Sequence, residues 1–431
     1  MTNIGEHSIQ LTTSEPIYSK PYPLPYALRE EVDQEIDRML QQGVIIPSNA
    51  PYASPLVVVR KPNGSLRLCV DYWKVNRVTV FDPEPMPQAE TIFAKLAGNR
   101  FYSKFDFSKG YWAIPMREED MDITTFTSHK GLYKFTVMPF GLVNAPATFN
   151  RLMRKLLNGN DDLHSYLDDV LAATRHWNSH LMVLRDFLTR VRAANFTLHP
   201  SKCYVGFPTL TFLGHEVGQF GIAPNTQTVE KIISASKPKN KKELRSFLGL
   251  VGYYHRFIPN FAAIAAPLTD LTRKGAPNVL PWDLPQENAF QALKRAITSR
   301  PILALPNFDI DFLVQTDSSN IGIGAVLLQE VDGVKHPITF ASRKLLLREC
   351  NYSTVERECL AIVWAVRKFE MYLYGRRFVL ETDHQSLQYL TKSKFENSRL
   401  MRWAMALQPF HFVVRVIKGS ANCGADYLSR S

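Results

Sequence analysis

Apolar and polar positions recur along this chain with either a helical period or a strand-like alternation, and the period changes between segments. The stretch LREEVDQEIDRMLQQG has apolar residues at 28, 32, 36, 39 and 40, a helical spacing that ends at Gly43. The stretch LVVVRKPNGSLRLCVDY predicts two strands around the Asn63-Gly64 turn. Helices are also expected over NAPATFNRLMRKLLNG, over roughly 177–195 and over most of 226–300.

Other segments predict strands. RFYSKFDFSKGYWAIPM predicts strand, turn and strand, and TLTFLGHEVGQFGI predicts a further strand pair. After the proline-rich RPILALPNF, which indicates a domain boundary, the pattern restarts with the strand pair DFLVQTDSSNIGIGAVLLQE. A long helix then opens with a capping box of Ser353 and Glu356. RRFVLETDHQSLQYL predicts a strand and a helix, and FHFVVRVIKGSANCGADYLSR a strand, a loop and a short helix.

The run HSYLDDVLAAT places two adjacent aspartates, Asp168 and Asp169, among apolar residues, and Asp106 ends the apolar strand FYSKFDF. Burying unpaired, mutually repelling carboxylates is costly. A pair of divalent cations would remove that repulsion if the strands are neighbours, and two such ions can drive phosphoryl transfer. The alternative is a solvated β-turn, which we would favour for an isolated pair of aspartates.

Four more carboxylates lie in the C-terminal third at positions that can converge on one edge of a mixed sheet. Asp317 and Asp383 end predicted strands, Glu358 lies early on the long helix, and Asp426 starts the last helix. Four acidic groups that converge again favour two hard cations, here for phosphodiester hydrolysis. For each residue alone, a surface acid or a helix cap is the better interpretation.

Composition narrows the class of protein. The 431 residues are 45% hydrophobic and 21% charged, typical of a globular protein of two to four domains. The net charge of +11 suits a polyanionic partner, although a merely basic soluble protein would carry it too. Five scattered cysteines argue for a reducing compartment, and no signal peptide or membrane-spanning run is visible, so we expect an intracellular protein without a membrane partner.

The motifs PYASPLVVVRKPNGSLRLCVDY, KFDFSKGYWAIPM, MPFGLVNAPATF, YLDD and FLGHEV occur in the order found in reverse transcriptases of gypsy-type long-terminal-repeat retrotransposons. TDSS, ERECLAIVWA, ETDHQSL and ANCGADYLSR resemble the ribonuclease H domain that follows that polymerase. The resemblance implies an α+β multidomain fold: a right-hand polymerase of fingers, palm and thumb, a helical or mixed connection, and an α/β ribonuclease H-like domain with a mixed sheet. The expected boundaries are 1–222 for fingers and palm, 223–305 for thumb and connection, and 306–431 for the ribonuclease H-like domain.

The resemblance also assigns roles to single residues. Asp106, Asp168 and Asp169 look like the metal-binding palm aspartates, joined by the backbone carbonyl of Phe107. Tyr111 looks like the residue that excludes a ribose 2′-hydroxyl, and Phe140 and Gly141 resemble the floor under the incoming nucleotide. Lys61 and Arg67 flank the hairpin turn and would reach the triphosphate of the incoming nucleotide. On an isolated hairpin, the same two residues would be ordinary surface charges. Asp317, Glu358, Asp383 and Asp426 would bind the ribonuclease H metals.

The implied function is RNA-directed DNA polymerisation with cleavage of the RNA strand of RNA–DNA hybrids. It requires Mg²⁺ or Mn²⁺, two ions per active site, and an RNA template, a DNA primer and dNTPs. A homodimer or other Pol segments are further candidate partners, and the expected location is cytoplasmic, in a virus-like particle, or nuclear. The alternatives are a non-catalytic nucleic-acid-binding remnant and a ribonuclease H with an inactive polymerase. The chain resembles a segment of a larger polyprotein or a truncated reading frame of one.

Some positions depart from the family pattern. Trp73 stands where an arginine is usual, and Cys423, Gly424 and Tyr427 replace usual residues around Asp426. We therefore expect ribonuclease H to be the weaker activity.

His176 and His180 have a metal-ligand spacing, but no third ligand motif accompanies them, so a helix surface is the preferred interpretation.

Overall fold

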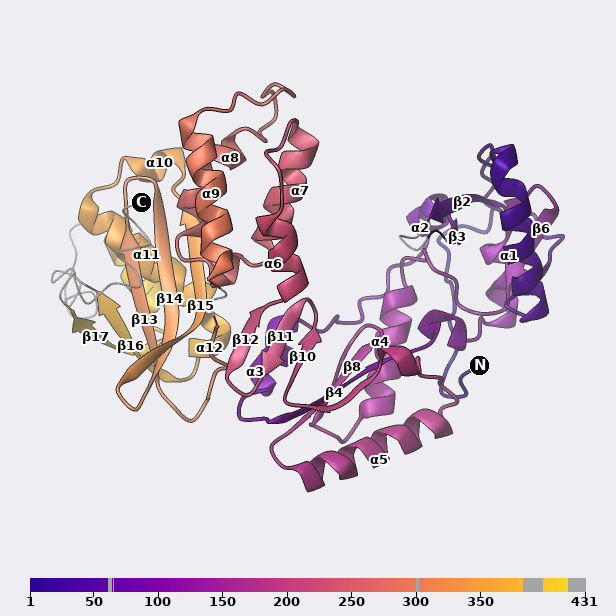
Figure 1. The fold of residues 1–431 in the computed structure, drawn as a ribbon, viewed down its shortest axis with the longest axis horizontal. Coiled ribbons are helices and arrows are strands. Elements are labelled where there is room, and N and C mark those ends of the chain that lie inside the picture. The colour runs from indigo at the N-terminus through magenta and orange to yellow at the C-terminus, as the bar shows by residue number, and fades with distance from the viewer. Residues whose placement is uncertain (61–63, 65, 300–301, 383–397, 418–431) are drawn as a thin grey trace. The chain divides into compact units, whose positions relative to one another are not determined.

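The computed structural model describes residues 1–60, 64, 66–299, 302–382 and 398–417 (Figure 1). The chain divides into two compact units, each described below by itself. The first contains Met1–Ile92 and Asn99–Leu210, and the second contains Phe93–Gly98 and Thr211–Ser431. The division at residues 222 and 305 expected from the sequence stays a prediction.

One sheet of the first unit has the strand order β1-β6-β5-β2-β3. Its strands are β1 (Ile45–Pro47), β2 (Ser54–Arg60), β3 (Leu66–Val70), β5 (Phe126–Ser128) and β6 (Gly131–Phe135). The predicted hairpin is confirmed, because β2 pairs with β3 in the register Arg60↔Leu66. Helix α1 (Arg29–Gln41) buries Val32, Ile36 and Met39 in the core of this unit, as its apolar spacing predicts.

A second sheet, in the order β7-β8-β4-β9, carries the aspartates of the YLDD run. Its strands are β4 (Phe101–Asp106), β7 (Leu163–Tyr166), β8 (Asp169–Thr174) and β9 (Tyr204–Phe207). Its helices are α4 (Ala145–Leu157), which contacts β7, and α5 (Trp177–Ala193), which contacts β8. Residues 170–174 of β8 are all buried, in agreement with their continuous apolar run.

The prediction of a second strand in the segment after Asp106 is wrong. Lys109 adopts a left-handed conformation with φ of 52°, and the chain then forms the 3-10 helix η2 (Gly110–Ala113). The Trp112 amide donates to the Lys109 carbonyl over 2.8 Å, which closes this turn. The alternating sequence here reflects residues packed around a tight turn, and periodicity alone cannot separate that from a short strand.

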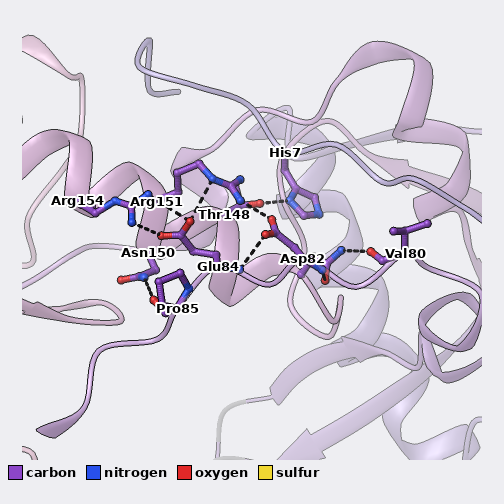
Figure 2. A network of polar contacts seen from close by, with 10 residues as sticks. His7, Val80, Asp82, Glu84, Pro85, Thr148, Asn150, Arg151 and Arg154 are labelled. Atoms are coloured by element: carbon purple, nitrogen blue, oxygen red, sulfur yellow. Dashed lines mark hydrogen bonds and ion pairs between the residues drawn. The ribbon is translucent and has the colours of Figure 1, made fainter.

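The N-terminal segment is attached to α4 by a polar network (Figure 2). His7 Nδ1 lies 2.8 Å from Thr148 Oγ1, and His7 is 1% exposed. Arg151 forms ion pairs with Asp82 at 2.6 Å and with Glu84 at 3.6 Å, so that the proline-containing segment 80–85 is also fixed to this helix. Burial lowers the pKa of His7 to about 4, with Arg151 acting in the same direction and Asp82 opposing it.

A three-stranded sheet, β10-β11-β12, follows along the chain where the sequence predicted only a pair. The strands are β10 (Thr209–Phe212), β11 (His215–Gly218) and β12 (Gly221–Pro224), and the second turn was not recognised in the sequence. The helices expected over 226–300 are confirmed as α6 (Thr226–Ile233), α7 (Lys241–Gly252), α8 (Phe261–Asp270) and α9 (Leu284–Thr298). Tyr253 and Tyr254 donate their hydroxyls to the carbonyls of Leu213 and Gly214, each over 2.6 Å.

The C-terminal part of the second unit is a mixed sheet in the order β15-β14-β13-β16-β17. Its strands are β13 (Phe312–Ser318), β14 (Gly322–Val331), β15 (Val334–Lys344), β16 (Arg377–Thr382) and β17 (His411–Val416), and β16 is parallel to both β13 and β17. Helix α11 (Thr354–Lys368) packs on β13 and opens with the predicted capping box of Ser353 and Glu356. The other α-helices of the described residues are α2 (Trp73–Arg77), α3 (Ala89–Lys95), α10 (Leu347–Cys350), α12 (Glu370–Leu373) and α13 (Ser398–Leu407).

Candidate active sites

The three aspartates of the first unit lie at one end of the sheet that contains β4 and β8. Strands β4 and β8 are antiparallel, and their register places Asp106 directly opposite Asp169. Strands β7 and β8 pair Tyr166 with Asp169, which leaves Leu167 and Asp168 as a two-residue turn. Leu167 has φ of 53°, a strained conformation for a branched side chain that is typical of functional turns. The neighbouring strands that the sequence analysis required are therefore present.

Lysines balance the charge of these aspartates. Lys104 Nζ lies 3.0 Å from Asp169 Oδ1, and Lys202 Nζ lies 3.3 Å from Asp106 Oδ1. Burial raises the pKa of Asp169; the ion pair with Lys104 opposes this rise, and the charges of Asp168 and Asp106 add to it. The carboxylates are thus close enough to repel one another, and the ammonium groups offset that repulsion.

Neither lysine is among the site residues expected from the sequence. Lys104 lies two positions before Asp106 on β4, where side chains share a face of the sheet, and this spacing is a signal the sequence contains. Lys202 lies 96 residues from Asp106 along the chain, in the short helix Pro200–Lys202. No local pattern could have paired Lys202 with Asp106.

A cleft of about 540 Å³ lies beside this turn, and most of the residues expected to bind the nucleotide line it. It is lined among others by Asp106, Phe107, Asp168, Tyr111, Phe140 and Arg67. The rings of Tyr111 and Phe140 stack with centroids 5.1 Å apart and planes at 19°. Burial raises the pKa of Tyr111, and the Asp168 charge adds to this rise, so the phenol stays protonated beside the aspartates.

Gly141 follows Phe140 with φ of +99°, a conformation that favours glycine. A Cβ at this position would lie 3.0 Å from the Val70 carbonyl oxygen. Asn76 fixes the same loop, since its Nδ2 donates to the Gly141 carbonyl and its Oδ1 accepts the Val143 amide, both over 2.9 Å. The loop below the cleft is therefore rigidly attached to α2. Lys61 lies outside the described residues.

The described part of the second carboxylate set contains Asp317 and Glu358, both 5% exposed. Asp317 lies near the end of β13, opposite Gly324 of β14. The neighbouring Ser318 donates its hydroxyl to Glu358 Oε1 over 2.7 Å, which joins β13 to α11 next to Asp317. Asp383 and Asp426, together with Cys423, Gly424 and Tyr427, lie outside the described residues.

In the described ranges, no group of three or more His, Cys, Asp or Glu side chains is arranged to hold a metal ion. In the first unit, Lys104 and Lys202 form ion pairs with carboxylate oxygens of Asp169 and Asp106. The ligand types still fit magnesium, which prefers carboxylate oxygens. We conclude that ions would have to replace these lysine contacts.

The histidines with metal-ligand spacing have a structural role. His180 is fully buried, with Nε2 2.7 Å from Ser103 Oγ and Nδ1 2.9 Å from Thr174 Oγ1. Burial lowers the pKa of His180, so the ring is neutral and joins α5 to the sheet. The helix-surface interpretation is therefore wrong for His180, while His176 is exposed and directly precedes α5.

Both units match known protein families. Residues 59–217 match the family described as reverse transcriptase (RNA-dependent DNA polymerase), and residues 307–410 match the RNase H-like domain found in reverse transcriptase. The chain therefore belongs to the reverse transcriptases that carry an RNase H-like domain, and the family expected from the sequence is confirmed.

Among its relatives are polyproteins of retrotransposons. The chain is 41% identical over 436 residues to the retrovirus-related Pol polyprotein from transposon 297 of Drosophila melanogaster, covering all of this chain and 41% of that polyprotein. It is 33% identical over 416 residues to the Tf2-3 polyprotein of Schizosaccharomyces pombe, covering 95% of this chain and 31% of that protein. The chain thus spans less than half the length of these relatives.

Solved structures confirm the expected fold. A foamy viral protease-reverse transcriptase in complex with dsDNA matches with a TM-score of 0.88 at 24% identity, over 97% of this chain and 88% of that chain. The same kind of protein in complex with an RNA/DNA hybrid matches with a TM-score of 0.83, over 97% of this chain and 57% of that one.

Within the described residues, every helix is too short or too polar to cross a bilayer.

Proposed function

We propose that this chain is an RNA-directed DNA polymerase that copies retroelement RNA into DNA by two-metal nucleotidyl transfer. We further propose that its RNase H-like domain cleaves the RNA strand of the resulting hybrid. The observation that carries the polymerase proposal is the register of β4 and β8, which places Asp106 opposite Asp169 with Asp168 in the adjoining turn. A solvated turn would need neither a third aspartate on the next strand nor two lysines to balance the charge.

The palm residues have distinct proposed roles. The carboxylates of Asp106, Asp168 and Asp169, with the Phe107 carbonyl, would hold Mg²⁺ or Mn²⁺. Two such ions would activate the primer 3′-hydroxyl and stabilise the leaving oxygen. Lys202 is released from Asp106 in this proposal and stays at the cleft, where its charge favours phosphate.

The cleft residues would bind the incoming nucleotide. Arg67, with Lys61 on the other side of the turn, would contact the triphosphate. The Tyr111 ring, held against Phe140, would occupy the space that a ribose 2′-hydroxyl needs. Gly141 lets the loop backbone approach the base pair without a side chain in between. These positions support a site for dNTPs paired with an RNA template at a DNA primer end.

For the nuclease, Asp317, Glu358, Asp383 and Asp426 would hold a second pair of ions. The burial of Asp317 and the contact of Glu358 with Ser318 support a fixed site at the end of β13. The proposed partners are the RNA template, the DNA primer and the RNA–DNA hybrid, with a homodimer or other Pol segments as further candidates. The proposed setting is a cytoplasmic virus-like particle or the nucleus.

The test is to assay both activities on one purified sample. Oligo-dT on poly-rA with dTTP and Mg²⁺ or Mn²⁺ should be extended, and a labelled RNA–DNA hybrid should be cut, with EDTA abolishing both. A folded monodisperse sample that binds hybrid but does neither would favour the non-catalytic remnant. Hybrid cleavage without extension would favour a ribonuclease H with an inactive polymerase.

A further inference from the structure

His7 joins two segments that are far apart in the sequence, the chain that follows η2 and helix α4. Its amide donates to the Pro115 carbonyl over 2.8 Å, and its carbonyl accepts the Arg117 amide over 2.9 Å. Its side chain contacts the helix, because Nδ1 lies 2.8 Å from Thr148 Oγ1 (Figure 2). The backbone and the ring of one residue therefore hold the two segments together.

Both of these segments support Tyr111. Tyr111 lies in η2, and the Thr2 amide donates to the carbonyl of Ala113, the last residue of η2, over 2.6 Å. On the side of α4, Phe149 directly follows Thr148 and is fully buried, and its ring centroid lies 5.5 Å from that of Tyr111. A change at His7 would therefore reach the Tyr111 ring through its own backbone and through the ring that packs against it.

The N-terminal segment around His7 packs closely on α4. A Cβ at Gly5 would lie 2.6 Å from Leu152 Cδ2, so a glycine is needed for this approach. Lys155 Nζ, further along the helix, donates to the Ile4 carbonyl over 2.9 Å. The backbone that carries His7 is thus fixed on the helix before the ring makes its own contact, and the ring loses little further entropy in making it.

His7 is a polar residue in a position where packing alone would favour an apolar one. The residue is 1% exposed, and its Nε2 is buried without a hydrogen-bond partner in the part of the chain that the structure describes. Burying a polar atom in this way costs free energy. Such a cost is typical of residues that serve a functional site, and the contact that the ring does make is the one with Thr148.

We propose that His7 is a positioning residue for the selection of deoxyribonucleotides. By joining Thr148 to the chain after η2, it holds the Tyr111 ring where the ring leaves no room for a ribose 2′-hydroxyl. This inference rests on the nucleotide site proposed above and adds to it a residue that touches neither nucleotide nor metal. A ring that excludes a single oxygen atom must be held to within about 0.5 Å, so the contacts behind it contribute to selectivity.

The test compares side chains that keep or lose the contact with Thr148. His7→Asn places an amide near the position of Nδ1 and keeps the contact, whereas His7→Gln places it near Nε2 and loses the contact. With dTTP and UTP on one primer, His7→Gln should raise the relative incorporation of the ribonucleotide by roughly threefold to tenfold, and His7→Asn should stay near the wild-type ratio. A loss of folded protein lowers both rates equally, so the ratio reports the placement of the ring.

Thr148→Val removes the hydroxyl from the other side and should raise the ratio as His7→Gln does, while Thr148→Ser should keep the wild-type value. The double variant His7→Gln with Thr148→Val should show no further rise, because both changes break the same contact. Glu6→Gln is the matched control. Glu6 precedes His7 and pairs with Arg117 at 3.0 Å, but both side chains are about half exposed, so losing this pair should leave the ratio unchanged.

Amide hydrogen exchange over residues 108–117 measures the mount of Tyr111 without catalysis. Exchange should be faster in His7→Gln and Thr148→Val than in the wild type and Glu6→Gln, and equal exchange in all four would overturn the inference. An unchanged ratio in folded His7→Gln, where Tyr111→Val does change it, would overturn the role of His7 and leave the polymerase proposal standing. Faster exchange in a chain that extends no primer would leave the support of η2 by His7 standing and overturn the polymerase proposal.

Discussion

The guanidinium carbon of Arg67 lies 4.6 Å from the centre of the Phe140 ring. Phe140 in turn stacks on Tyr111, so a residue of the β2–β3 hairpin, a loop residue and a residue of η2 form one continuous wall of the cleft. The hairpin is therefore fixed to the floor of the site by a cation–π contact, worth about 0.5–2 kcal/mol. This wall is the structural basis for the first two predictions.

Arg67→Ala should raise the KM for dNTP about tenfold or more, because a charge-assisted contact to the triphosphate and the contact with Phe140 are both lost. Arg67→Lys should recover only part of this, since an ammonium keeps the charge but loses the planar stack. Steady-state extension kinetics measure the effect. Arg60→Ala, on the same hairpin and paired with Glu31 at 3.0 Å, should leave KM unchanged, and an equal rise there would indicate a general loss of the hairpin.

Tyr111→Val should increase incorporation of ribonucleotides relative to deoxyribonucleotides by roughly tenfold or more, because the ring that would exclude the 2′-hydroxyl is removed. Single-nucleotide extension with dTTP and UTP on the same primer gives the ratio. Tyr111→Phe keeps the ring and its stack on Phe140, so it should retain the wild-type ratio. Unchanged discrimination in Tyr111→Val would remove this residue from the nucleotide site.

Gly141→Ala should lower stability by about 1–3 kcal/mol and reduce extension, because the new Cβ requires a left-handed alanine and crowds the Val70 carbonyl. Urea unfolding and primer extension measure the two effects. Gly159→Ala is the matched control: Gly159 has φ of +80°, and a Cβ added there would have no neighbouring atom within 4 Å. It should lose some stability through strain alone and keep its activity.

His7 should make the first unit sensitive to acid. Its folded pKa of about 4 lies below the ordinary 6.5, so between these values the unfolded chain binds a proton that the folded chain does not. Stability is therefore complete above pH 6.5 and falls toward pH 4, by about 2 kcal/mol at pH 5 relative to pH 7.5. Urea midpoints of wild type and His7→Gln at both pH values isolate this contribution, and an identical pH dependence in the two proteins would contradict it.

Local sequence patterns correctly predicted the elements that depend on residues close together in the chain. The apolar spacing of α1, the turn residues between β2 and β3, and the capping box of α11 each depend on residues close in sequence, and each is confirmed. The motif order indicated the family and the fold class. A strand was expected where the 3-10 helix η2 follows Lys109, because a left-handed lysine leaves no compositional signal.

In the first unit, the three aspartates of the candidate site could be chosen from the sequence, whereas Lys202 could not. A buried aspartate is conspicuous because burial without a partner is costly. The partner of Asp106, Lys202, is an ordinary basic residue until the fold brings it to 3.3 Å. Asn76 is similar, since its two hydrogen bonds to the Gly141 loop join segments 65 and 67 residues apart.

The central claim is that two separate carboxylate sites perform two separate reactions, and exchanging one carboxylate at a time tests it most directly. Asp106→Asn should abolish primer extension and leave hybrid cleavage intact, whereas Glu358→Gln should do the opposite. Both assays should be run on the same preparations, with hybrid affinity measured as the control for folding. Loss of both activities in either folded variant, or extension that persists in Asp106→Asn, would contradict the account.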